Sequence, residues 1–81
     1  MDIKHEIELI IGEILGVTVL MEDDANFMYD YNMDSLQIMN IVVKIEEKFN
    51  IEFELEDLNI EDLIVFSKIV EVVKKTLKQD A

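Results

Sequence analysis

Ser35 is the residue with the clearest chemical potential, because it ends a polar loop and begins a segment of helical periodicity, residues 36–49. Its hydroxyl is therefore expected at a helix N-terminus, where unpaired backbone N–H groups and the positive end of the helix dipole lie. A phosphate esterified to this hydroxyl would have favourable electrostatics there. Helix capping is the simpler alternative, since Asp34 or Ser35 could accept a bond from the first turn, and Asp34 could form a loose capping box with Gln37. On these residues alone, capping is the commoner role.

No catalytic residue and no metal site is predicted. A hydrolytic role for Ser35 would need a neighbouring base and a Gly-x-Ser-x-Gly elbow. The elbow is absent, and the only histidine, His5, falls in a different predicted helix, on its expected solvent side. Asp30, Asn32 and Asp34 have the spacing of the first three ligands of an EF-hand loop, but the glycine and the glutamate that such a loop requires are missing.

The composition fits one small domain that spans residues 1–81. A chain of 81 residues with 51% hydrophobic residues can form a single core. The absence of cysteine excludes disulfides, thiolate metal sites and cysteine nucleophiles. No apolar run approaches the roughly 18 residues of a membrane span, and the first residues lack the pattern of a signal peptide. We therefore expect a cytoplasmic protein that does not insert into membranes.

Acidic residues are concentrated in the middle of the chain. The net charge is −12; residues 22–62 contain thirteen acidic residues and two lysines, whereas residues 63–81 contain two acidic residues and four lysines. Such a surface disfavours nucleic acid and anionic membranes, and it attracts basic patches on other proteins at rates that fall with salt. A role in solubility alone explains the charge equally well.

Apolar residues recur at helical spacing in the pattern of a small helix bundle. The first helix is predicted between Asp2, a candidate N-cap, and Gly16, a helix stop. A second is predicted over residues 35–49, a short third over residues 55–60 and a fourth over residues 66–77. The expected fold class is all-α, with three longer helices and one short helix.

The loop over residues 17–34 is too long to lack packing in a compact domain. We expect part of it to fold back onto the core, through Val17, Val19, Leu20, Phe27 and Tyr31. Residues 17–21 are the nearest candidate for a strand, but a single strand has nothing to pair with.

The helix predicted over residues 35–49 has two apolar faces at about 100° per residue. The wide face is expected in the core and consists of Ile38, Ile41, Val42, Ile45 and Phe49. The opposite side carries a narrow stripe of Leu36, Met39 and Val43, flanked by Asn40, Glu46 and Glu47. An apolar stripe with a polar rim is typical of a protein-binding surface. Burial under the preceding loop and a homodimer contact are the alternatives.

Residues 30–36, Asp-Tyr-Asn-Met-Asp-Ser-Leu, resemble the 4′-phosphopantetheine attachment motif of acyl carrier proteins. In that motif four positions come before Asp-Ser-Leu and a long helix. The first is acidic, the second is variable, the third is usually Gly and the fourth is variable. Here the residues that match are Asp30, Asp34, Ser35 and Leu36. The resemblance spans nearly the whole chain, and its further parts are Phe27, residues 45–49, residues 51–53, Glu56 and Asp57. The departures are Asn32 in place of Gly, although Asn tolerates positive φ, and Glu54 where the family often has Pro.

This resemblance implies a carrier and not an enzyme. A phosphopantetheinyl transferase, using magnesium and coenzyme A, would join 4′-phosphopantetheine to Ser35, and Asp34 and Leu36 would help it recognise the site. The thiol of the arm would hold acyl groups as thioesters. Partner enzymes with basic surfaces would read the second helix, through Leu36, Met39, Val43, Glu46 and Glu47, and a monomer is expected.

Two alternatives stay open. The fatty-acid carriers of this family usually have acidic residues along the start of the second helix, where this chain has Gln37 and Asn40, followed by Lys44 and Lys48. A carrier for a polyketide, an aminoacyl or peptidyl group, or a modified lipid is therefore an alternative to a fatty-acid carrier. From a different class, an acidic helical interaction module without a prosthetic group would use Ser35 only as a cap.

Overall fold

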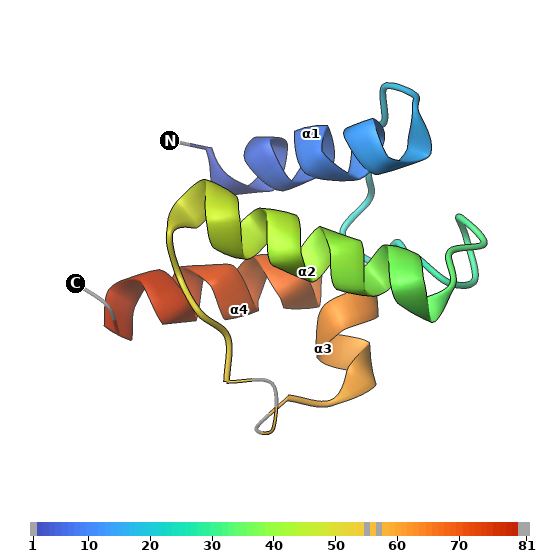
Figure 1. Ribbon diagram of the computed structural model, residues 1–81. Helices are drawn as coiled ribbons and strands as arrows, with labels where there is room; N and C mark the ends of the chain where they lie inside the picture. Colours follow the sequence, from blue (N-terminus) through green and yellow to red (C-terminus); the bar gives the residue numbers. More distant parts are fainter. Residues whose placement is uncertain (1, 55, 57, 80–81) are drawn as a thin grey trace.

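Four helices are present in the computed structural model, which describes residues 2–54, 56 and 58–79. They are α1 (Ile3–Leu15), α2 (Ser35–Phe49), α3 (Ile60–Ile64) and α4 (Phe66–Gln79). The predicted all-α bundle of three longer helices and one short helix is confirmed. α1 runs antiparallel to α2 and α4, and α3 lies near the beginning of α2 (Figure 1). Within the described ranges, no helix is long and apolar enough to cross a membrane.

α1 begins and ends where the sequence predicts. Asp2 Oδ1 accepts a hydrogen bond from the His5 N–H at 3.2 Å, which caps the first turn. At the other end, the N–H groups of Gly16 and Val17 donate to the Gly12 carbonyl at 2.8 and 3.0 Å. Gly16 has a φ of 76°, in the left-handed region that glycine enters without steric cost.

The short helix predicted over residues 55–60 overlaps α3 only at Ile60, so α3 begins later than predicted. Leu55 and Asp57 lie outside the described residues, and the rest of the range before α3 contributes no α-helix. Asn59 has the extended backbone of an N-cap, and its N–H donates to Asp62 Oδ2 at 2.9 Å. This bond fixes the start of the helix later than apolar spacing alone suggests.

The loop over residues 17–34 returns to the bundle through backbone hydrogen bonds. Phe27 is fully buried, and its N–H donates to the Ile64 carbonyl at 2.7 Å. The N–H of Phe66 donates to the Ala25 carbonyl at 2.9 Å. These bonds, together with an isolated β-bridge, attach the loop to the junction of α3 and α4.

Two loop residues that were expected to pack are exposed, so that part of the prediction is wrong. Val17 and Leu20 are 57% and 84% exposed. Met21 occupies the buried position instead, because Glu8 Oε2 accepts its backbone N–H at 2.7 Å and directs the chain back to the core at that point. The other predicted contacts are confirmed: Phe27 is buried, and Val19 and Tyr31 pack partly buried against the core.

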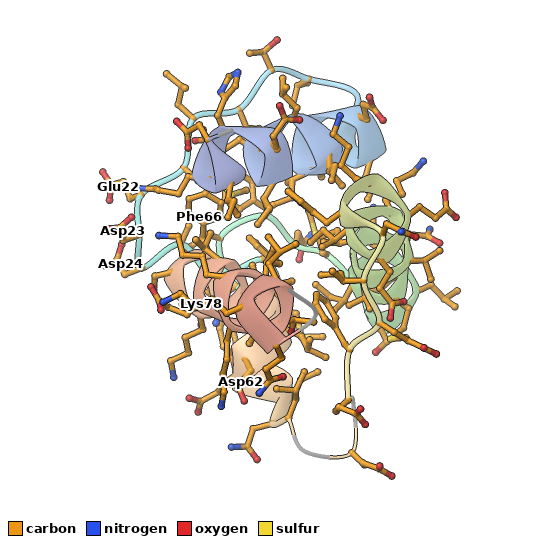
Figure 2. All side chains as sticks on the ribbon, turned by 90° about the vertical axis from the view of Figure 1, so that its left-hand side faces the viewer. Glu22, Asp23, Asp24, Asp62, Phe66 and Lys78 are labelled. Carbon is orange, nitrogen blue, oxygen red and sulfur yellow. The ribbon has the colours of Figure 1, made fainter. Side chains whose placement is uncertain are left out.

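The core lies between α1, α2 and α4. The predicted core face of α2 is confirmed, since Ile38, Ile41, Val42 and Ile45 are buried and Phe49 packs partly buried beside them. In Figure 2, Phe66 lies in the interior, whereas the acidic side chains at positions 22–24 point outward from the loop. Among the residues with described side chains, every buried one is apolar.

Candidate functional site

The start of α2 is fixed by a capping box. Asp34 has extended backbone angles, φ −96° and ψ 179°, and its Oδ1 accepts the N–H of Gln37 at 2.9 Å. In return, Gln37 Oε1 accepts the N–H of Asp34 at 3.2 Å. Asp34 is therefore the N-cap and Ser35 is the first helical residue. The Ser35 hydroxyl is not needed to cap the helix, so capping does not account for this serine.

Asn32 makes the turn that delivers the chain to this helix start. Its φ is 58°, one of two positive φ values among the described non-glycine residues. Asparagine is among the non-glycine residues that adopt the left-handed conformation most readily. The substitution of Asn32 for the glycine usual at this position therefore preserves the turn.

The acidic residue at the beginning of the motif has a structural role in the loop. Asp30 Oδ2 accepts the backbone N–H of Asn26 at 2.8 Å. Asn26 Oδ1 in turn accepts the N–H groups of Met28 and Tyr29, each at 3.0 Å. These bonds form a compact turn immediately before the motif. Asn26 is not among the residues predicted from the sequence, although an Asn whose side chain bonds to the backbone two residues ahead is a known turn signal.

Ser35 lies in surroundings that fit an esterified phosphate. The residue is exposed, and Asp34 and Leu36 on either side are exposed as well. The first turn of α2 contains no acidic residue, and the carboxylate of Asp34 is directed to the backbone N–H of Gln37. The first backbone N–H groups of the helix have no partner within the helix and are oriented to interact with an anion. A phosphodiester at Ser35 would meet favourable charge and no steric obstacle from the motif.

The outer face of α2 is open to solvent. Leu36, Met39 and Val43 are 77%, 42% and 45% exposed. The preceding loop does not cover them, so the alternative of burial under that loop is excluded. Glu47 lies exposed one turn beyond Val43, on the same side of the helix.

Glu46 differs from the other residues at the rim of this face. It is partly buried, and its Oε2 accepts the backbone N–H of Phe53 at 2.9 Å. This bond attaches the segment that follows α2 to the last turns of the helix. The carboxylate of Glu46 therefore has a structural role that helical periodicity could not reveal.

The only histidine of the chain, His5, lies on a different helix from Ser35. His5 is exposed on α1, and its Nδ1 lies 3.8 Å from Glu8 Oε1. α1 begins at the end of the bundle opposite to the start of α2 (Figure 1). No cluster of three or more His, Cys, Asp or Glu side chains suited to a metal ion occurs in the part of the chain that the structure describes.

The comparison with protein families agrees with this geometry. The family described as "Phosphopantetheine attachment site" matches residues 5–73, which include the whole motif, all of α2 and most of α1. The chain belongs to the acyl carrier protein family. Its prosthetic group is therefore covalent 4′-phosphopantetheine, and its role is that of a carrier and not of a catalyst. An interaction module without a prosthetic group is excluded by this match.

Curated relatives extend over almost the whole chain. An acyl carrier protein of Chlamydia caviae is 31% identical over 75 residues, which cover 91% of this chain and 95% of that protein. An acyl carrier protein of Nitratidesulfovibrio vulgaris is 32% identical over 73 residues, with coverage of 84% and 96%. A D-alanyl carrier protein of Leuconostoc mesenteroides is 26% identical over 77 residues, with coverage of 95% and 99%. As a carrier, this protein must be recognised by a phosphopantetheinyl transferase and by the enzymes that load and process its cargo.

Proposed function

We propose that Ser35 is the attachment site of the 4′-phosphopantetheine arm. The observation that carries this assignment is the position of Ser35 as an exposed first residue of α2, at a helix end that Asp34 already caps. In the modification, the Ser35 oxygen forms a bond to the phosphorus of the phosphopantetheine half of coenzyme A, the pyrophosphate bond breaks, adenosine 3′,5′-bisphosphate leaves, and the hydroxyl proton is released. When attached, the arm supplies a terminal thiol that can hold an acyl group as a thioester.

The residues beside Ser35 have distinct roles in this proposal. Asp34 holds the helix start in register, so that the hydroxyl and the first backbone N–H groups of α2 face the same anion. Leu36 is 77% exposed and offers an apolar contact directly next to the modified residue. Both residues form part of the surface that the transferase would read.

The outer face of α2 is proposed as the surface for partner enzymes. Its exposed apolar stripe of Leu36, Met39 and Val43 would be desolvated in a complex, and burial of such groups stabilises association. The exposed carboxylate of Glu47 adds a contact for basic side chains on the partner. The high acidic charge of residues 22–62 would raise the rate of encounter with such partners.

We infer that the cargo is an acyl intermediate of fatty-acid, polyketide or related biosynthesis. Several relatives that extend over most of the chain are named acyl carrier proteins, which supports this choice. An aminoacyl cargo is the second candidate, because the D-alanyl carrier protein aligns with 95% of the chain. Gln37 and Asn40 at the start of α2, in place of acidic residues, also favour a specialised carrier. The cytoplasmic location and the monomeric state stay predictions.

Intact-mass spectrometry tests the attachment site. The protein is incubated with coenzyme A, magnesium and a broad-specificity phosphopantetheinyl transferase, and we expect a gain of one phosphopantetheinyl group. Ser35→Ala should abolish the gain with little change in the circular dichroism of the helices. Ser67→Ala is the matched control, because Ser67 lies within α4 and its change should leave the gain intact. A gain that persists in Ser35→Ala would contradict the assignment.

A further inference from the structure

Six of the seven lysines of this acidic protein fall into two groups, and the seventh, Lys44, is exposed on α2 and forms no ion pair with the described residues. Three of them form ion pairs with acidic residues of other segments: Lys4 with Asp23 at 2.8 Å, Lys68 with Glu61 at 2.8 Å and Lys48 with Glu6 at 3.4 Å. The hydrogen bonds to these carboxylates raise the pKa of Lys4 and of Lys68 above the ordinary lysine value. Lys74, Lys75 and Lys78 on α4 are exposed, and none of them pairs with a carboxylate of the described residues. We call these three residues the α4 lysine cluster.

Helix-dipole stabilisation does not account for the whole cluster. Cations stabilise a helix only within about its last turn. Lys78 is the only lysine in the last turn of α4. Lys74 and Lys75 lie further back and gain little from the dipole.

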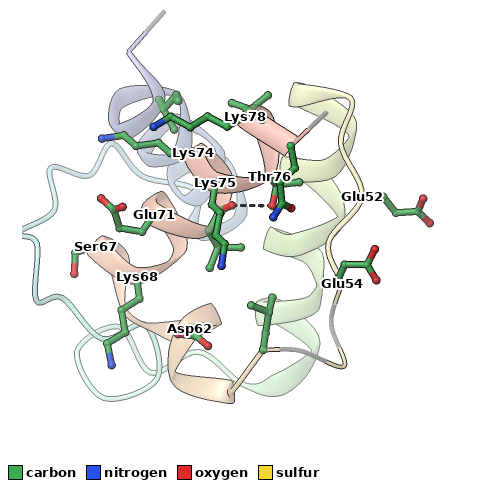
Figure 3. A pocket seen from close by; sticks show the side chains of 15 residues that line it. Glu52, Glu54, Asp62, Ser67, Lys68, Glu71, Lys74, Lys75, Thr76 and Lys78 are labelled. Carbon is green, nitrogen blue, oxygen red and sulfur yellow. Dashed lines mark hydrogen bonds between the residues drawn. The ribbon is translucent and has the colours of Figure 1, made fainter. Parts of the chain in front are cut away.

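The cluster borders a groove between α4 and the segment that follows α2 (Figure 3). Lys75 projects toward this groove, whereas Glu52 and Glu54 on its opposite edge point away from it. Leu58 and Val72 line the groove and are partly buried. Asp62 and Glu71 also line the groove, so its excess of positive charge is confined to the α4 lysine cluster, which lies beside a small apolar surface.

The cluster and Ser35 lie at opposite ends of the bundle. α2 and α4 run in the same direction, so the C-terminal turns of α4 lie far from the N-terminus of α2 (Figure 1). A molecule bound to the cluster would leave Ser35 and the first turns of α2 accessible.

A protein segment fits the cluster better than a membrane does. A helix that binds a lipid surface presents large apolar side chains beside its basic residues, and none of the exposed large hydrophobic residues lies on α4. The net charge of −12 also opposes approach to an extended anionic surface. A short acidic segment would meet mainly the local field of the cluster, because charges more than about 8 Å apart are largely screened at physiological ionic strength.

We propose that the α4 lysine cluster and the adjoining groove bind a short acidic segment of a partner protein. Carboxylates of the segment pair with Lys74, Lys75 and Lys78, and one apolar side chain occupies the surface formed by Leu58 and Val72. Because this site is remote from Ser35, it holds the carrier on its partner while the prosthetic arm remains free. This site is separate from the surface proposed above for the transferase.

An NMR titration of the unmodified protein tests this site. The probe is a capped peptide with four glutamates around one leucine, and the matched probe replaces every glutamate with glutamine. We expect the acidic peptide to shift the amide signals of Lys74, Lys75, Lys78 and Val72, with no comparable effect of the neutral peptide. The triple variant Lys74→Gln, Lys75→Gln, Lys78→Gln should bind roughly tenfold more weakly, as loss of three exposed ion pairs implies. Lys44→Gln, which changes an exposed lysine of α2, should bind as the parent does.

Three results would overturn the proposal. One is a triple variant that binds the acidic peptide as tightly as the parent. Another is binding to phosphatidylglycerol vesicles without binding to the peptide, which would assign the cluster to a membrane. The third is slower modification of Ser35 in the triple variant, which would place the cluster in the transferase surface. The titration uses unmodified protein, so its outcome is independent of whether Ser35 carries the arm.

Discussion

Asp34 and Gln37 bond to each other's backbone across the first turn of α2, at 2.9 and 3.2 Å. This reciprocal pair fixes the residue at which the helix begins. Ser35 follows immediately and keeps its hydroxyl free of a capping role. Because Asp34 caps the helix, Ser35 can be modified covalently without loss of the cap.

Asp34→Ala should lower the free energy of unfolding by about 0.5–2 kcal/mol, because the N–H of Gln37 loses its acceptor. Asp34→Ser should restore most of this loss, since serine also caps helices well. If the transferase reads the charge of Asp34, the serine variant will still be modified slowly. Urea unfolding and the rate of mass gain measure the two effects. Equal modification rates in the parent and Asp34→Ser would show that the aspartate acts only as a cap.

Asn32→Gly should keep or slightly increase stability, because glycine adopts a φ of 58° without steric cost. Asn32→Val should lower the free energy of unfolding by about 1–2 kcal/mol, the cost of a left-handed conformation with a branched side chain. Thermal unfolding of both variants measures the difference. A valine variant as stable as the parent would mean that this turn has another accessible conformation.

Met39→Ala and Val43→Ala should change folding stability little, since both side chains are more than two-fifths exposed. Ile45→Ala should lower the free energy of unfolding by roughly 2–5 kcal/mol, because Ile45 is fully buried and its truncation leaves a cavity. Turnover by the transferase and by a loading enzyme should follow the opposite ranking. If the two outer-face variants unfold as easily as Ile45→Ala, the stripe belongs to the core and the partner surface lies elsewhere.

Glu46→Lys and Glu47→Lys make a matched pair with the same change of charge. Glu46→Lys should lower the free energy of unfolding by about 1 kcal/mol, because the N–H of Phe53 loses its acceptor. Glu47→Lys should leave stability nearly unchanged, and it should slow association with basic partners and reduce the salt dependence of the rate. Chemical unfolding and stopped-flow binding separate these effects. Equal losses of stability in both variants would contradict the structural role given to Glu46.

The melting temperature should rise as sodium chloride increases from low to moderate concentration. Residues 22–62 hold thirteen acidic residues and two lysines, so their mutual repulsion opposes the compact state until salt screens it. Millimolar magnesium should raise the melting temperature further through weak binding to the acidic surface. Differential scanning calorimetry measures both effects, and a melting temperature that stays flat would show that this repulsion does not limit stability.

Features that depend on neighbours a few residues apart could be predicted from the amino-acid sequence. The ends of α1 at Asp2 and Gly16, the extent of α2 and its two faces follow from capping residues and from helical spacing. The positive φ of Asn32 follows from the side chains that tolerate it. Ser35 could be singled out for the same reason, because its position at a helix start is a local property.

Features that depend on partners distant in the sequence could not be predicted and follow from the packing of the folded chain. Phe27 is held by the carbonyl of Ile64 and Met21 by the carboxylate of Glu8, and these bonds determine which loop residues are buried. Val17 and Leu20 are just as apolar as the buried loop residues, so hydrophobicity could not distinguish them. The bond from Phe53 to Glu46 likewise crosses between segments and leaves no periodic signal in the sequence. Local periodicity fixes which residues share a face, but only the packed chain decides which polar groups meet across segments.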